Sequence, residues 1–145
     1  MKQVQKGRNF IGRIPHGADM LEFLTNFVNE HEINCAKINC IGAVQKVSLM
    51  FYDQNDKQYA TTEVDKKLEL VHVIGNVSHL EGKRFVHIHG TFSDEHEVCY
   101  GGHVGPNTII FACECIIEEF TDMDGEPFEL TRHYDEVTKL SLWEQ

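Results

Sequence analysis

The chain has 145 residues and a mass of 16.7 kDa, which suits one domain with one hydrophobic core and is too short for two. Its 13 basic and 23 acidic residues give a net charge of −10, so the surface as a whole repels nucleic acid, which proteins bind largely by neutralising phosphates with Lys and Arg. No apolar stretch approaches the roughly 18 residues of a membrane span, and the first residues lack the apolar core of a secretory signal. We therefore expect a single domain over residues 1–145, located in the cytoplasm and without a membrane partner.

The start of the chain departs from the overall acidity. Residues 1–16 contain Lys2, Lys6, Arg8 and Arg13 and no acid. The favoured interpretation is a solvated edge strand with scattered cations, and the alternative is a weak local contact with nucleic acid.

The five cysteines are an odd number, and two of them, Cys113 and Cys115, are at strand spacing. Because a cytoplasm keeps thiols reduced, we interpret all five as small buried hydrophobic residues rather than as disulfides or metal ligands.

The first half of the chain predicts a strand, a helix and then more strands. Residues 9–14 form a short strand that ends at the turn Pro15-His16-Gly17. Over Ala18–His31 apolar residues recur at intervals of three and four, which predicts one long helix with an apolar stripe. The period then changes to two, predicting strands over 33–41 and 43–52 before a polar hairpin turn at 53–57.

The second half continues the strand pattern, with predicted strands at 58–62, 68–77, 84–92 and 108–120 and with turns at 78–82 and 93–95. For residues 128–145 we expect a strand followed by a short helical turn. Because the short connections cannot supply the long crossovers of parallel strands, the fold class is α+β, a mostly antiparallel curved sheet with one long N-terminal helix.

Three histidines form the strongest candidate site. His87 and His89 alternate with apolar residues on one strand, so they share a face at a separation from which two imidazoles can bind one ion. His103 follows Gly101-Gly102, fourteen positions after His89, where a hairpin would bring it beside the first two. Three neutral imidazoles with an open fourth position are typical of catalytic or exchangeable zinc, so we predict a divalent metal, with zinc as the leading candidate.

Other interpretations of the histidines remain open at this point. They could donate to backbone carbonyls and line a polar seam between subunits. The segment from Gly82 to Asp94 loosely matches a cupin metal motif, but its spacing is imperfect and the long helix is unlike a jelly roll. Glu114, on an apolar strand, is the candidate second-shell partner or general base, and Arg132 could neutralise it. The remaining histidines lack comparable partners and are interpreted as surface or core residues.

Taken together, these segments resemble the PPC domain, the "plants and prokaryotes conserved" domain, over nearly the full length. The resemblance depends on the segments 15–19, 41–44 and 68–77, on Phe85-Val86-His87-Ile88-His89-Gly90 with Gly101-Gly102-His103-Val104, and on Glu114 and Arg132. It implies an α+β domain that assembles as a homotrimer and is described in bacteria and archaea as a predicted DNA-binding protein. The AT-hook of the plant relatives is not found in this sequence, nor is the Gly-Arg pair that precedes their Phe-Glu-Ile-Leu segment.

Two functions follow from these features. The first is a non-enzymatic homotrimeric regulator that contacts nucleic acid or protein and uses metal for stability. The second is a metal-dependent hydrolase or lyase, in which an ion on His87, His89 and His103 activates water and Glu114 carries the proton. We favour the first, because no nucleophile, phosphate loop or second carboxylate accompanies the histidines.

Overall fold

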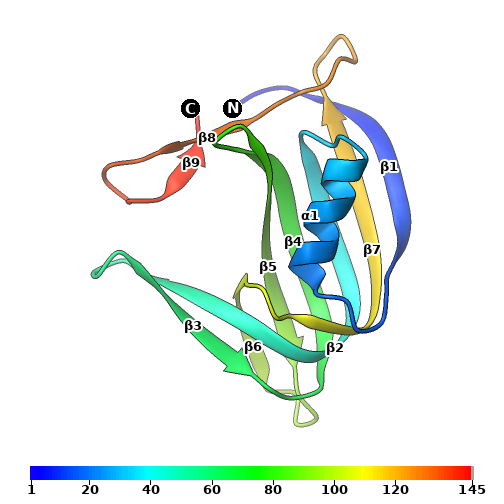
Figure 1. The fold of residues 1–145 in the computed structure, drawn as a ribbon, viewed down its shortest axis with the longest axis vertical. Coiled ribbons are helices and arrows are strands. Elements are labelled where there is room, and N and C mark those ends of the chain that lie inside the picture. The colour runs from blue at the N-terminus through cyan, green and yellow to red at the C-terminus, as the bar shows by residue number, and fades with distance from the viewer. Residues whose placement is uncertain (145) are drawn as a thin grey trace.

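The computed structural model describes residues 1–144 and contains one helix and one nine-stranded sheet (Figure 1). The elements, in chain order, are β1 (Gln5–Ile14), α1 (Met20–Glu30), β2 (Ala36–Asp53), β3 (Gln58–Val64), β4 (Leu68–Leu80), β5 (Lys83–Ser93), β6 (Cys99–Val104), β7 (Ile109–Thr121), β8 (Thr131–Tyr134) and β9 (Ser141–Trp143). Pairing is antiparallel throughout except between β4 and β8. The predicted α+β class, with a mostly antiparallel curved sheet, is confirmed. No helix among these residues is long and apolar enough to cross a membrane.

The long strand β2 organises the sheet, because its two halves have different neighbours. Residues 36–44 pair with β4 and β7, whereas residues 47–53 pair with β3, and Leu49 and Met50 pair with β6. Since β6 also pairs with β5, and β5 with β4, the strands β2, β4, β5 and β6 close into a ring. Both strands that carry the candidate histidines belong to this ring.

The two faces of the sheet have different roles. The helix packs its buried residues Met20, Leu24 and Val28 against one face, where they join the hydrophobic core with strand residues such as Val86 and Ile88. Side chains alternate along a strand, so His87, His89 and Thr91 point to the opposite face. The helix and the candidate histidines therefore lie on opposite sides of the sheet.

The helix begins where its sequence predicts a cap. The Asp19 side chain accepts a hydrogen bond from the Glu22 backbone N–H at 3.0 Å, as an N-cap residue does. The helix runs from Met20 to Glu30 rather than over the predicted Ala18–His31, because Asp19 caps one end and Glu32 turns the chain with a positive φ of 53° at the other.

Two expectations about the strands are corrected. The predicted strands 33–41 and 43–52 are one strand, β2, with an irregularity in its pairing at Gly42. A Cβ at this position would lie 2.1 Å from the Ala112 carbonyl oxygen, so the glycine permits close approach instead of ending the strand. The tail forms a hairpin of β8 and β9, and residues 141–143 are a strand rather than the expected helical turn.

Four of the five cysteines are buried and free, in agreement with their interpretation as small hydrophobic residues: Cys35, Cys40, Cys113 and Cys115. Cys99 is the exception, since it is exposed at the start of β6, directly after the turn from β5. Burial raises the pKa of the Cys35 thiol to about 11, so it stays protonated and unreactive near neutral pH.

Candidate metal centre

The hairpin of β5 and β6 positions the three histidines. Asp94 holds the turn between the two strands, since its Oδ1 accepts hydrogen bonds from the backbone N–H groups of His96 and Val98. The resulting register pairs His89 directly with His103, and His87 lies two residues before His89 on the same face. Asp94 thus stabilises the turn, and the turn sets the register that pairs His89 with His103.

The three imidazoles converge. The ring centroids of His87 and His89 are 4.9 Å apart, those of His87 and His103 are 4.9 Å apart, and those of His89 and His103 are 5.2 Å apart. One ring nitrogen from each residue can be chosen so that all three lie within 4.8 Å of one another. Nitrogen atoms at this spacing can move onto a common ion with bonds of about 2.0–2.1 Å after small side-chain rotations.

The electrostatic surroundings keep the imidazoles neutral, which is the form that binds metal. The pKa of His87 is lowered from 6.5 to about 4, first by burial and then by the nearby charges of Arg132, His103 and His89. Burial also lowers the pKa of His89 and of His103. All three rings therefore keep a free lone pair at neutral pH.

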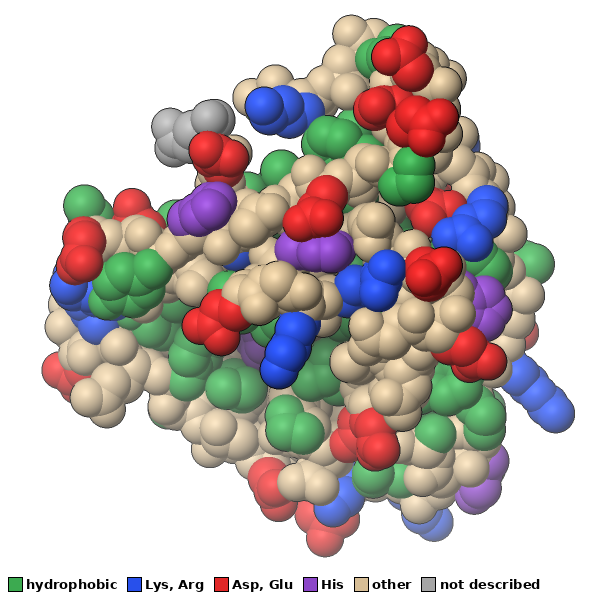
Figure 2. All heavy atoms as spheres, turned by 45° about the horizontal axis from the view of Figure 1, so that its top comes forward, with side chains coloured by type: hydrophobic (Ala, Val, Ile, Leu, Met, Phe, Trp, Pro, Cys, Tyr) green, Lys and Arg blue, Asp and Glu red, His purple; other side chains and the backbone are tan. Residues whose placement is uncertain are grey.

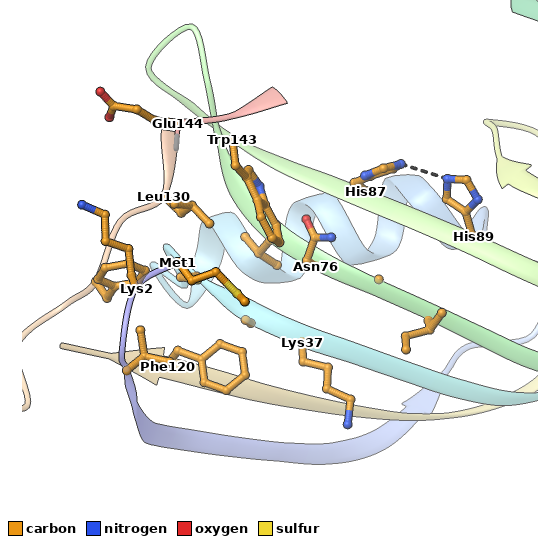
Figure 3. Close-up of a pocket in the computed structure, with 17 residues that line it drawn as sticks. Met1, Lys2, Lys37, Asn76, His87, His89, Phe120, Leu130, Trp143 and Glu144 are labelled. Carbon is orange, nitrogen blue, oxygen red and sulfur yellow. Dashed lines mark hydrogen bonds between the residues drawn. The ribbon is translucent and has the colours of Figure 1, made fainter. Parts of the chain in front are cut away.

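Arg132 fixes the orientation of the His87 ring. Its Nη2 donates to Asn76 Oδ1 at 3.1 Å and lies 3.2 Å from His87 Nδ1. Because a guanidinium only donates, His87 Nδ1 accepts this bond and the proton of the neutral ring is on Nε2. That proton fits the 3.0 Å contact between the Nε2 atoms of His87 and His89 (Figure 3). For a neutral His87 to bind an ion through Nε2, this proton would have to move to Nδ1, and the contact of Nδ1 with Arg132 would have to open.

His103 supplies an independent test of whether the residues fit a metal. Its Nδ1 is buried and has no hydrogen-bond partner among the described residues. Buried ring nitrogens usually have a partner, because an unsatisfied polar atom costs about 1–3 kcal/mol. The His103 ring has a buried nitrogen without a partner and lies beside two rings with converging lone pairs. This arrangement fits the binding of a metal ion. His87, His89 and His103 would hold the ion.

A groove opens beside the histidines on the face of the sheet opposite the helix, which we call the outer face. It has a volume of about 960 Å³ and contains His87 and His89 at one end. Figure 3 shows Asn76 and Trp143 between that end and the far end, where the first residues of the chain lie. Its walls are mainly apolar side chains, including Ile74, Phe120, Leu130 and Trp143. The centre is thus accessible to a small molecule from the side.

The structure does not bring Glu114 to the histidines within one chain. Glu114 is exposed on β7, and β2 and β4 lie between β7 and the histidine strand β5. Three steps between strands amount to roughly 14 Å at about 4.8 Å each. Arg132, by contrast, is brought directly to His87, and it does not contact Glu114.

The four basic residues near the N-terminus do not form a free cationic patch. Arg8 makes an ion pair with Glu119 at 2.6 Å, and Lys6 lies 3.9 Å from Glu118. Lys2 lines the groove, and Arg13 is opposite Glu114 in the pairing of β1 with β7. On the face shown in Figure 2, acidic side chains lie between the lysines and arginines.

Sequence reasoning missed Asn76, Ser78 and Trp143, which surround the Arg132 guanidinium. Asn76 is paired with His87 across β4 and β5. The alternation along β4 places Ile74 and Asn76 on one face, and this pattern could have indicated that Asn76 lies beside the histidines. Ser78 accepts from Arg132 Nε at 2.8 Å, and the Trp143 ring lies 5.6 Å from the guanidinium carbon. Nothing in the local sequence indicated that β8 and β9 return to this place.

The fold and the site together define a β-rich domain with a three-histidine candidate metal centre on its sheet. The family model for the Plants and Prokaryotes Conserved domain, abbreviated PCC or PPC, matches residues 1–121. The chain belongs to this family. A search of the curated proteins finds no match.

Solved structures show the same fold. A metal-containing protein from Archaeoglobus fulgidus is 32% identical, with a TM-score of 0.90 over 100% of this chain and 99% of that chain. A PPC protein from Pyrococcus horikoshii is 28% identical, with a TM-score of 0.91 over 100% and 96%. A protein from Bacteroides thetaiotaomicron, proposed to bind DNA, is 21% identical, with a TM-score of 0.86 over 97% and 96%.

Proposed function

We propose that this protein is a metal-binding, homotrimeric regulator of the PCC family that holds one divalent ion per chain on His87, His89 and His103. The observation that carries the proposal is the convergence of these three imidazoles within 4.8 Å. The unpartnered Nδ1 of His103 supports it, as does the metal in the Archaeoglobus relative. Zinc is the ion we expect, because three neutral imidazoles and one open position suit its coordination.

Elemental analysis tests the metal proposal directly. The wild-type protein, purified without chelator, should contain about one equivalent of a divalent metal per chain, as a three-ligand site predicts. His89→Ala should lose most of it. His72→Ala, which removes an exposed histidine from β4, is the matched control and should keep the wild-type content. Full metal content in the His89 variant would contradict the ligand assignment.

The outer face of the sheet supports assembly with further copies of the chain. Directly paired residues on β1, β7, β2 and β4 place Ile11, Ile116 and Ile74 in one row that leads to His89, and Ile41 is on the same face. These side chains are between 43% and 85% exposed. Because contiguous exposed apolar surface marks interaction sites, this face is our candidate for the trimer interface.

Sedimentation or light scattering should give the mass of a trimer for the wild type and a smaller species for Ile116→Lys. Val98→Lys introduces the same charge at an exposed apolar residue of the β5–β6 turn and should leave the mass unchanged. A wild-type monomer, or a trimer that tolerates Ile116→Lys, would contradict this part of the proposal.

Direct DNA binding is the weaker part of the regulator proposal. It is supported by the relative proposed to bind DNA, but the pairing of Arg8 and Lys6 with acids leaves little free positive charge. Duplex binding across a salt series decides the matter, since phosphate contacts give an affinity that falls steeply with salt. No binding at about 50 mM salt would restrict the regulator to protein or small-molecule partners.

A metal-dependent hydrolase or lyase is the second candidate, and the groove beside His87 and His89 favours it. A bound divalent ion would supply Lewis acidity and lower the pKa of water. Glu114, the candidate proton carrier, lies three strands from His89, so it does not serve as the general base within one chain. Screening the metal-loaded wild type against esters and oxo acids, with His89→Ala as control, tests this candidate.

A further inference from the structure

Arg132 is a half-buried cation whose partners are all neutral. Its guanidinium donates to three oxygens and faces one ring nitrogen, at distances of 2.8–3.2 Å: Ser78 Oγ, Asn76 Oδ1, the Ser141 carbonyl and His87 Nδ1. The guanidinium carbon, Cζ, also lies 5.2 Å from the Phe85 ring centroid and 5.6 Å from the Trp143 ring centroid. Within residues 1–144, no carboxylate is at ion-pair distance from it.

This arrangement is unusual for so acidic a chain. There are 23 acids for 13 basic residues, and Arg8 shows the common solution, a charged pair with Glu119. Glu144, the acid that lines the groove, lies beside His133. A partly buried arginine is normally paired, because removing its charge from water is costly. The missing counter-charge therefore indicates that something outside the described chain supplies it.

Arg132 lies next to the candidate metal centre, so a negative charge that balances it should bind near that centre. Metal-binding histidines usually donate their second nitrogen to a carboxylate or a carbonyl, whereas His87 has a guanidinium at that atom. A divalent ion on three neutral imidazoles would add two positive charges close to this cation. A strongly positive centre without a protein carboxylate favours an anion at the open coordination position.

We propose that the metal-loaded site binds an organic carboxylate, with its charged group on the ion near Arg132 and its apolar body along the groove. The inference rests on the proposed metal site and adds the class of its ligand. The groove selects an organic anion over inorganic phosphate, because the walls that continue from the histidines include the apolar side chains of Leu130 and Trp143. Arg132 is a positioning residue here, because its positive charge attracts the carboxylate without a bond to it.

The test uses the protein loaded with Co²⁺, whose visible spectrum responds to its ligands, and titrates it with acetate, hexanoate and inorganic phosphate. Both carboxylates should change the spectrum, and hexanoate should bind about tenfold more tightly than acetate because its chain covers apolar wall. In Arg132→Gln protein that has been loaded with cobalt, both carboxylates should bind about tenfold more weakly. Arg132→Lys, which retains the charge, should stay within a few-fold of wild type, and Arg8→Gln is the matched control away from the site.

The outcomes separate this inference from the metal proposal. If the wild type does not hold cobalt, the metal site fails and the ligand inference fails with it. If cobalt is bound but neither carboxylate changes the spectrum, the inference alone is wrong. Equal affinities for acetate and hexanoate, tighter binding of phosphate, or unchanged carboxylate affinity in a cobalt-loaded Arg132→Gln protein would also overturn it.

Discussion

The partly buried position of His87 predicts how the stability of the metal-free protein depends on pH. Its pKa is about 4 in the folded chain and near 6.5 when the chain unfolds, so the unfolded state takes up a proton first as the pH falls. The free energy of unfolding should therefore fall below about pH 6.5 and stop falling, for this group, below about pH 4. Linkage between about pH 7.5 and pH 5 gives a loss of about 2 kcal/mol from His87, and partial exposure reduces it to about 1–2 kcal/mol.

Urea unfolding with chelator present, at both pH values, measures this loss. His87→Gln lacks the titrating ring and should lose about 1–2 kcal/mol less than wild type. His72→Gln, which removes an exposed ring from the same sheet, should behave as wild type. The lowered pKa values of Asp94 and Glu119 act at lower pH and are common to all three proteins, so they cancel. Equal losses in wild type and His87→Gln would refute the reasoning.

Three further predictions concern the framework of the site. Gly75→Ala should cost about 2 kcal/mol or more in urea unfolding and reduce metal content, because its Cβ would lie 2.3 Å from Ile88 Cγ2 and 2.4 Å from the His87 carbonyl oxygen. The control is Gly12→Ala, whose Cβ would have nothing within 4 Å and which should change stability by less than about 0.5 kcal/mol. Asp19→Ala should cost about 1–2 kcal/mol, since it removes the acceptor for the N–H groups of Glu22 and Asn107. Chelation should lower the Tm of wild type but not of His89→Ala, because wild type loses about 2.7 kcal/mol of stabilisation where free metal stood at 100 times its Kd.

The convergence of the three histidines could be predicted because their geometry is local. Alternation along a strand placed His87 and His89 on one face, and a hairpin of the right length brought His103 opposite His89. The same reasoning failed at Gly42, where a glycine in a strand pattern was interpreted as a break. A bulge and a break look alike in sequence, because both need a residue without a side chain.

The surroundings of the site could not be predicted, because they depend on pairing between distant segments. Arg132 reaches His87 across 45 positions, through a parallel contact of β8 with β4 that no short-range pattern encodes. The sequence left open whether Arg132 neutralises Glu114, and the structure brings Arg132 to His87 instead. Residue type suggested an ion pair, whereas the register of the sheet places the two side chains on strands that do not meet.

The closed ring of β2, β4, β5 and β6 affects how an ion would enter and leave. His89 and His103 are each paired on both sides, and His87 is paired with Asn76 on β4, so the backbone there holds its shape before any ion arrives. Loading and release then require only rotations of side chains at the end of an open groove. Exchange of one metal for another should accordingly be fast compared with unfolding of the chain, and the ion found after purification would reflect the supply in the host cell.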